Sequence, residues 1–196
     1  MDFKASKTIV NLGRAFAGES QARNRYLFYA EQAKKEGYEA LNKIILGIAY
    51  NEYAHAQEFF KHVKNHCGAP LPNLNIDAGY PYEWETTNQN LQFAANAENA
   101  EATEIYPSFA DVAKSEGYTD IERTFRLIAE VEAQHNKIFT ELYDKFNGDK
   151  VYQSQTPVEW ECSFCGYRHT GTQAWGVCPI CGKPQGWVKI PLSSSK

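Results

Sequence analysis

Four segments of this chain place apolar residues at spacings of three and four, and each interrupts that pattern with glutamate or histidine near its middle. The pattern is clearest between about residues 120 and 146, where the stripe reads Ile121, Phe125, Ile128, Glu132, His135, Phe139 and Leu142. Such spacings hold side chains on one face of an α-helix. Glu132 and His135 therefore occupy positions that belong to the buried core of a helical protein.

The other three segments, at about 7–36, 39–65 and 88–115, show the same interruption. Their stripes are Ile9, Leu12, Phe16, Glu19, Tyr26, Ala30 and Ala33; Leu41, Ile44, Ile48, Glu52, His55, Phe59 and Val63; and Leu91, Ala94, Glu98, Glu101, Ile105, Phe109 and Val112. Pro107 lies inside the third segment, and we expect it to kink that helix because proline removes a backbone donor.

The connections between these segments predict the topology. EGYEA at 36–40 and EGYTD at 116–120 are short links with a glycine suited to a helix C-terminus, which indicates two antiparallel hairpins. A long loop, 68–88, joins the hairpins. Two hairpins and one long crossover predict an all-α, ferritin-like four-helix bundle.

The two hairpins also repeat each other at an offset of 80 residues. Glu36-Gly37-Tyr38 recurs as Glu116-Gly117-Tyr118, and the Glu52/His55 pair recurs as Glu132/His135. Glu19 departs from this register by one residue, since its counterpart is Glu98. The interrupting side chains are thus present twice.

The inward polar residues are five acids and two histidines: Glu19, Glu52, His55, Glu98, Glu101, Glu132 and His135. They would be surface charges if the stripes were misplaced by one residue, or buried ion pairs if their charges balanced, but they are mostly of one sign. Burying uncompensated carboxylates costs several kcal/mol per ion, so we expect two divalent metal ions among them. Iron or manganese suits mixed carboxylate and imidazole ligands, although affinity alone does not exclude zinc.

The spacing of these residues supports a paired metal site. Glu-x-x-His places both side chains one turn apart on one face, and the carboxylate-bridged pattern combines two such motifs with single glutamates from two other helices. Glu101 is a seventh candidate in a pattern that needs six. Tyr26 and Tyr106 lie about two turns from Glu19 and Glu98, where they would either hydrogen-bond a ligand carboxylate or pack in the core.

The C-terminal region has a different character. We expect a bundle over 1–147, a linker over 148–157, a small metal-stapled domain over 158–191 and a tail over 192–196. Cys162-x-x-Cys165 and Cys178-x-x-Cys181 predict one tetrahedral thiolate site, either a structural zinc ribbon or an FeS4 centre. Cys67 stands alone and is expected to be a reduced thiol. His62 and His66 lie on the polar side of their helix, and we expect them to be solvated.

Charge and hydropathy narrow the class further. A net charge of −4 argues against binding to nucleic acid, and no apolar run approaches the length of a membrane span. The start of the sequence lacks the apolar core of a secretory signal, so a cytoplasmic protein is expected.

Together these motifs resemble the rubrerythrin family over nearly the whole chain. The resemblance rests on GESQARNRY at 18–26, NEYAHAQEF at 51–59, AENAEATEIYP at 97–107, EVEAQH at 130–135, and the CSFCG and CPICG pairs. It implies a bundle with two irons and a rubredoxin-like domain with one iron per chain, acting as a hydrogen peroxide reductase in oxidative stress protection. The resemblance assigns the oxidised iron pair to Glu19, Glu52, Glu98, Glu101, Glu132 and His135. It also implies that Glu101 and His55 exchange on one iron upon reduction.

The resemblance further implies a homodimer and electron supply from a rubredoxin or an NAD(P)H-dependent reductase, because the chain shows no nucleotide-binding motif. Three other functions stay open at this point. A ferroxidase or iron-storage protein shares the bundle, a di-iron oxygenase needs an organic substrate pocket, and a non-catalytic metal protein would carry zinc on its cysteines.

Overall fold

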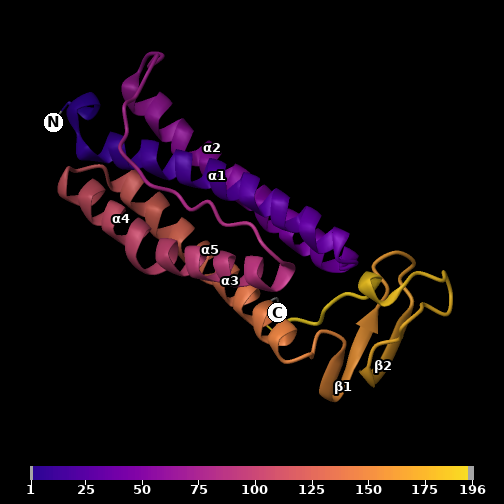
Figure 1. Cartoon of the computed structure of the whole chain (residues 1–196). Coiled ribbons are helices and arrows are strands. Elements are labelled where there is room, and N and C mark those ends of the chain that lie inside the picture. The colour runs from indigo at the N-terminus through magenta and orange to yellow at the C-terminus, as the bar shows by residue number, and fades with distance from the viewer. Residues whose placement is uncertain (1, 194–196) are drawn as a thin grey trace.

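Two antiparallel helical hairpins make up most of the molecule, and a small β-domain sits at one end of them (Figure 1). The computed structural model describes residues 2–193, so residues 1 and 194–196, which include most of the expected tail, lie outside the described residues. After a short 3-10 turn, η1 (Phe3–Ala5), the helical elements are α1 (Lys7–Lys35), α2 (Glu39–Cys67), α3 (Thr87–Ala100), the π-helical turn η2 (Glu101–Ile105), α4 (Tyr106–Ser115) and α5 (Thr119–Asn147). The ferritin-like four-helix bundle is confirmed.

Both hairpin turns are built alike. Gly37 and Gly117 adopt φ values of 91° and 88°, in the left-handed region that glycine enters without strain. The following N–H groups, of Tyr38 and Tyr118, donate back into the preceding helix at 2.8 and 2.9 Å. This geometry ends each helix and reverses the chain.

The glutamate that precedes each turn glycine ties one hairpin to the other. Glu116 accepts hydrogen bonds from the backbone N–H groups of Lys7 and Thr8 at the start of α1, at 3.0 and 2.9 Å. Glu36 accepts one from the N–H of Thr87 at the start of α3, at 3.1 Å. A carboxylate at a helix N-terminus satisfies unpaired donors and complements the helix dipole.

The bundle interior contains two apolar clusters with the carboxylates and histidines between them. One cluster, nearer the small domain, includes Tyr26, Tyr29, Leu41, Ile45, Ile48, Leu91, Phe139 and Leu142. The other includes Phe3, Ile9, Leu12, Phe59, Tyr106, Ile121, Phe125 and Ile128. Two stripe assignments were wrong: Phe16 is 39% exposed and contacts Phe60 on the outer surface, and Ile105 is 38% exposed.

The third helical segment contains one turn of π-helix rather than a simple proline kink. The turn covers Glu101–Ile105, and Pro107 follows it in the first turn of α4, where the missing N–H costs little. A π turn inserts one extra residue into a helix. That extra residue explains why the offset is 79 between Glu19 and Glu98 but 80 between Tyr26 and Tyr106, and it turns Ile105 out of the core.

The long crossover between α2 and α3 packs along the bundle instead of looping into solvent (Figure 1). Arg14 donates from Nε to the carbonyl oxygen of Asp77 at 2.9 Å, and the Tyr80 hydroxyl donates to the carbonyl of Arg14 at 2.8 Å. Within residues 2–193, none of the helices combines the length and hydropathy needed to cross a lipid bilayer.

The small domain consists of an antiparallel pair, β1 (Gln153–Glu161) and β2 (Arg168–Gln173), and the 3-10 turn η3 (Gln185–Trp187). Among the described residues, its own buried apolar cluster consists of Trp160, Ala174 and Val188, with Tyr152, Val158 and Trp175 packed against it. Strand β1 begins inside the range expected to be a linker, and Val151 and Ile190 join the apolar cluster of the bundle.

The domain docks on the α1–α2 turn. Lys43 of α2 donates to the carbonyl of Ser163 at 3.1 Å, and its ammonium lies 4.9 Å from the ring centre of Trp187. Gly186 approaches the carbonyl of Gly37 so closely that a Cβ atom there would lie 1.7 Å from that oxygen.

Candidate metal centres

The structure brings the seven acids and histidines predicted from sequence to the middle of the bundle. Glu19 comes from α1, Glu52 and His55 from α2, Glu98 from α3, Glu101 from η2, and Glu132 and His135 from α5. All are at least nine-tenths buried, and Glu19, Glu98 and Glu132 are fully buried. The interruptions in the apolar stripes are therefore interior positions and not misplaced surface charges.

Six of the seven residues form two overlapping quartets. The first consists of Glu19, Glu52, His55 and Glu132, and the second of Glu52, Glu98, Glu132 and His135, each with one ligand atom per residue within 4.8 Å of the others. Glu52 and Glu132 belong to both. Each of these two carboxylates presents one oxygen to each histidine. His55 Nδ1 lies 3.1 Å from Glu52 Oε2 and 2.9 Å from Glu132 Oε1. His135 Nδ1 lies 3.1 Å from Glu52 Oε1 and 2.8 Å from Glu132 Oε2.

Glu19 belongs only to the first quartet and Glu98 only to the second, and each lies close to the histidine of its quartet. Glu19 Oε2 lies 3.7 Å from His55 Nδ1, and Glu98 Oε2 lies 3.5 Å from His135 Nδ1. Two shared carboxylates flanked by one glutamate and one histidine on each side form an arrangement with approximate two-fold symmetry. This is the ligand geometry of a carboxylate-bridged pair of metals.

The unsatisfied atoms of the cluster test whether metals fit there. Among the described residues, the buried carboxylate atoms without a hydrogen-bond partner are Glu19 Oε2, Glu52 Oε1, Glu98 Oε2 and both oxygens of Glu132. Buried polar atoms are normally paired. These oxygens converge on the two quartets, so the residues fit two hard or borderline cations.

The pKa values of the buried glutamates and of His135 also indicate that this cluster of carboxylates is stabilised by positive charge. Burial raises the pKa of Glu19 and Glu98 well above the ordinary value of a glutamate. Burial alone would lower the pKa of His135, but the nearby carboxylates of Glu132 and Glu52 outweigh it and raise the pKa to about 12. A protein ligand to a metal must be deprotonated. Metal binding therefore releases the protons that the histidines otherwise hold between the carboxylates.

Two tyrosines support the terminal glutamates in a crossed arrangement. The hydroxyl of Tyr26 on α1 donates to Glu98, and the hydroxyl of Tyr106 on α4 donates to Glu19. Each tyrosine thus holds the glutamate of the other hairpin. Both tyrosines also pack in the apolar clusters, so the two alternatives that the sequence offered occur together. Each hydroxyl contacts the glutamate of the other hairpin rather than the one nearest in sequence.

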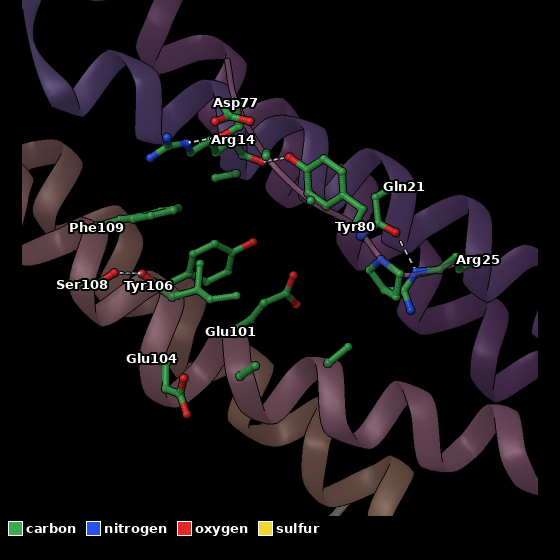
Figure 2. A pocket seen from close by; sticks show the side chains of 18 residues that line it. Arg14, Gln21, Arg25, Asp77, Tyr80, Glu101, Glu104, Tyr106, Ser108 and Phe109 are labelled. Atoms are coloured by element: carbon green, nitrogen blue, oxygen red, sulfur yellow. Dashed lines mark hydrogen bonds between the residues drawn. The ribbon is translucent and has the colours of Figure 1, made fainter. Parts of the chain in front are cut away.

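Glu101 occupies a different place from the other six residues. It belongs to neither quartet, and it lines a pocket of about 520 Å³ between α1, the crossover and the π turn. Figure 2 shows its carboxylate directed into this pocket, with Tyr106 beside it and Arg25 and Tyr80 on the opposite wall. Burial raises the pKa of Glu101 well above its ordinary value.

Arg25 and Asn51 were not identified from the sequence. Arg25 is 93% buried in the pocket wall, donates from Nε to Gln21 at 2.6 Å, and has no hydrogen-bond partner for Nη1 among the described residues. Asn51 places its side-chain amide 3.1 Å from Nε2 of His135. The Arg25 contact lies within α1, whereas the Asn51 contact joins α2 to α5. The only sequence signal was that Arg25 and Asn51 lie within the motifs that include Glu19 and Glu52.

The four cysteines of the small domain meet in one cluster. Sγ distances are 3.8 Å between Cys162 and Cys181 and 3.7 Å between Cys165 and Cys178. A tetrahedral site with metal–sulfur bonds of about 2.3 Å requires sulfur separations of about 3.8 Å. The cluster is therefore already spaced for one metal ion.

Each cysteine pair lies on a similar turn. Gly166 and Gly182 have φ values of 76° and 70° and donate to the carbonyls of Cys162 and Cys178 at 2.9 Å. Burial raises the pKa of Cys178, but the N–H groups of Cys181 and Ile180 outweigh it and lower the pKa to about 7. Backbone donors aimed at sulfur favour the thiolate that a metal binds.

A ferritin-like bundle with a paired carboxylate–histidine site, followed by a four-cysteine domain, defines a di-iron protein with a rubredoxin-like domain. The family model described as Rubrerythrin matches residues 11–143 and 90–163, and the model for the rubrerythrin rubredoxin-like domain matches residues 160–186. The chain is 44% identical over 187 residues to Rubrerythrin-1 of Clostridium acetobutylicum and 39% identical over 188 residues to rubrerythrin of Nitratidesulfovibrio vulgaris. Both alignments cover 95% of each chain. This chain belongs to the rubrerythrin family.

Solved structures agree with this assignment. Nigerythrin in a mixed-valent state aligns with a TM-score of 0.63 at 26% identity, covering 94% of this chain and 88% of that one. A Desulfovibrio desulfuricans bacterioferritin, described as having a diiron site in different catalytic states, aligns over 75% of this chain and 83% of that one, with a TM-score of 0.67 at 25% identity. The chain thus carries a di-iron site in its bundle and a third iron on its four cysteines.

Proposed function

We propose that this protein reduces hydrogen peroxide to water at the di-iron site. The observation that carries this proposal is the position of Glu101: a buried carboxylate on a π turn, outside both quartets and facing a pocket, while His55 completes the first quartet. A bundle that only stores iron has no need of this seventh residue. The arrangement matches the set that the family resemblance implies for the reduced pair.

Specific ligand roles follow from the two quartets. Glu52 and Glu132 would bridge the irons, with Glu19 and His55 completing one shell and Glu98 and His135 the other. Glu101 would replace His55 on its iron after oxidation. When bound, the iron pair supplies the two electrons that cleavage of the O–O bond requires and stabilises charge that develops on oxygen.

The chain's own residues would bring peroxide to the site and supply protons. Reduction of one peroxide molecule consumes two protons and two electrons and yields two water molecules. Of the seven cluster residues, Glu101 is the one that lines the pocket, so its carboxyl can give a proton to an entering oxygen species. Arg25 Nη1 offers a buried donor on the facing wall, suited to holding a small polar molecule there.

The four-cysteine domain would supply electrons, because a thiolate-ligated iron carries one electron at a time. Phe164, Val177 and Ile180, next to the cysteines, are 60 to 70% exposed, and they offer an apolar face for an external donor such as a rubredoxin or an NAD(P)H-dependent reductase. Ser163 contacts Lys43, which lies nine residues from Glu52 on α2, about 14 Å along the helix axis.

A homodimer is part of the proposal. Tyr50, Tyr53 and Phe60 on α2 are 71, 45 and 55% exposed, and Phe16 of α1 contacts Phe60. Exposed aromatic residues gathered over two helices are typical of a surface that another protein covers. In such a dimer the cysteine domain of one subunit could serve the irons of the other.

The proposal is tested by comparing Glu101→Ala with Glu130→Ala, which changes an exposed glutamate on the ligand helix α5. In protein purified without oxygen, Glu101→Ala is expected to keep three irons per chain and to oxidise ferrous iron, but to lose rapid re-oxidation by peroxide. Glu130→Ala should match the unaltered protein in both assays. Unchanged peroxide turnover in Glu101→Ala would instead favour the ferroxidase or iron-storage function.

A further inference from the structure

A third group of metal-ligating side chains lies at the end of the bundle opposite the small domain (Figure 1). His62 and His66 occupy successive turns near the C-terminus of α2, and Asp120 is the second residue of α5. One nitrogen from each histidine and one Asp120 oxygen lie within 4.8 Å of one another. The group is distinct from the iron sites, and its side chains come from two different helices.

The distances show that Asp120 lies between the two histidines. Asp120 Oδ2 is 2.8 Å from His66 Nε2 and 3.5 Å from His62 Nδ1. The expectation that both histidines are solvated was wrong, because the side chains of His62 and His66 are only 17 and 26% exposed. Asp120 is 57% exposed, which leaves one side of the group open to water.

Thr124 selects the nitrogen of His62 that faces the group. The Thr124 hydroxyl lies 3.1 Å from the carbonyl of Asp120, which can only accept, and 2.8 Å from Nε2 of His62. Both contacts are satisfied when the hydroxyl donates to the carbonyl and accepts from an Nε2–H group. The Nδ1 atom of His62 then carries a lone pair, and this lone pair faces a carboxylate oxygen.

Two acceptors that face each other at 3.5 Å repel, and either a proton on one of them or a metal ion between them removes the repulsion. With Nε2–H directed at Thr124, the Nδ1 lone pair of His62 is available to a metal ion. A hydrogen bond from the far nitrogen of a histidine to an outer partner is the usual support for a metal-ligating imidazole. Thr124 supplies that support here.

Neighbouring rings hold His66 in place. Phe3 lies 4.9 Å from its ring centre, and Tyr118 packs edge-on at 5.7 Å. The carboxylate of Glu58, one turn before His62, is engaged by Lys61 at 2.7 Å. Three protein ligands with a solvent-exposed side suit a divalent ion that completes its shell with water.

We propose that His62, His66 and Asp120 form an accessory site for a borderline divalent transition metal such as Zn²⁺, which links the end of α2 to the start of α5. Two imidazoles and one carboxylate are a ligand set of this class of ion. Binding to the folded protein alone would also stabilise this end of the bundle.

Calorimetric titration of the iron-loaded protein with Zn²⁺ tests the site, with iron measured before and after to show that the other centres keep their metal. The unaltered protein should bind one Zn²⁺ per chain and gain thermal stability. The double variant His62→Gln/His66→Gln should lose both effects, whereas His169→Gln, which changes an exposed histidine on β2, should keep them. Thr124→Val should weaken binding about 10-fold through loss of the outer hydrogen bond.

Two results would overturn the proposal. One is the absence of Zn²⁺ binding to unaltered protein that retains its iron. The other is binding of equal affinity in the double variant, which would place the ion elsewhere. Circular dichroism and iron content of the double variant establish that it is folded, so that a loss of binding reflects the missing ligands.

Discussion

The two hairpins of the bundle are near copies that differ by one residue in the middle of one helix. The first, α1–α2, and the second, α3–η2–α4–α5, share their turn glycines, their capping glutamates and their Glu-x-x-His motifs in register. The second contains an additional residue between Glu98 and Tyr106, accommodated as a π turn. When Ala22 is matched with Ala102, Glu101 is that additional residue.

The residues that the two hairpins share form a metal site with approximate two-fold symmetry, and the additional residue in the π turn makes that site asymmetric. Tyr26 of the first hairpin donates to Glu98 of the second, and Tyr106 of the second donates to Glu19 of the first. The symmetric arrangement therefore forms only when both hairpins pack together. The π turn adds one carboxylate and one pocket on a single side. In the proposed function, the repeated part of the hairpins would position the metals. The additional residue, Glu101, would give one iron an alternative ligand and a small molecule a way in through the pocket.

The largest effect, on the iron content of the bundle, is expected when a carboxylate that belongs to both quartets is removed. Glu52→Gln and Glu132→Gln each damage both quartets, so each variant should lose nearly all of the bundle iron while keeping the iron on its cysteines. Glu19→Gln and Glu98→Gln damage one quartet each and should be milder, and similar to each other. Metal analysis of anaerobically purified protein measures this, and unequal losses within either pair would refute the functional symmetry of the hairpins.

Deletion of Glu101 makes the second hairpin match the first. The deletion should convert the π turn to regular α-helix, keep two bundle irons, and lower the rate of peroxide reduction about 100-fold, comparable to the loss of one catalytic group. Stopped-flow absorption of the reduced protein mixed with peroxide gives the rate. A deletion of Ala133 in α5 is the contrasting case, since it shifts His135 and should cost iron as well.

Substitution of either turn glycine is expected to have a moderate effect on the free energy of unfolding, and the two effects should be equal. Gly37→Ala and Gly117→Ala should each lower the free energy of unfolding by about 1–2 kcal/mol, the cost of a left-handed conformation for a residue with a Cβ atom. Denaturant unfolding followed by circular dichroism measures both. Gly186→Ala sharpens the comparison, because its Cβ would meet the Gly37 carbonyl and should undock the small domain. The bundle should then lose only the stability that its contacts with Val151 and Ile190 contribute.

The smallest effect on stability is expected from substitution of Glu116, which joins the second hairpin to the start of α1 in the first. Burial raises its pKa slightly, but hydrogen bonds from Thr8 and Lys7 outweigh it and lower the pKa below the ordinary value. A lowered pKa in the folded state means that the stabilisation is present above the unfolded pKa of about 4.3 and is lost as the pH falls through the folded value.

Glu116→Gln should therefore cost about 0.5 kcal/mol at pH 7, a modest figure because solvent screens this partly exposed group. The difference from the unaltered protein should shrink as the pH falls below the unfolded pKa of about 4.3 and vanish once Glu116 is protonated in the folded state as well. Thermal unfolding at several pH values measures it, and a difference that grows as the pH falls would contradict the assignment.

Much of the fold and site could be predicted because local periodicity and repetition encode them. The four interrupted stripes, the turn glycines and the two cysteine pairs depend on residues a few positions apart, and such patterns set helix faces, caps and metal-ligand turns. The membership of Glu52, His55, Glu132 and His135 in one buried cluster follows from the repeat alone. The shift between offsets 79 and 80 also signals the π turn, although proline suggested a simple kink.

What the sequence by itself determined is the ligand inventory and the bundle; what only the tertiary structure decided is which ligands share a metal, which one faces the pocket, and how distant elements meet. The crossed tyrosine pairs, the buried Arg25 beside the crossover, and the His62–Asp120 contact between α2 and α5 each join residues more than 50 positions apart. Such contacts depend on the packing of whole helices, which no local pattern specifies. Phe16 and Ile105 show the same limit, because small rotations of a helix move a side chain from core to surface.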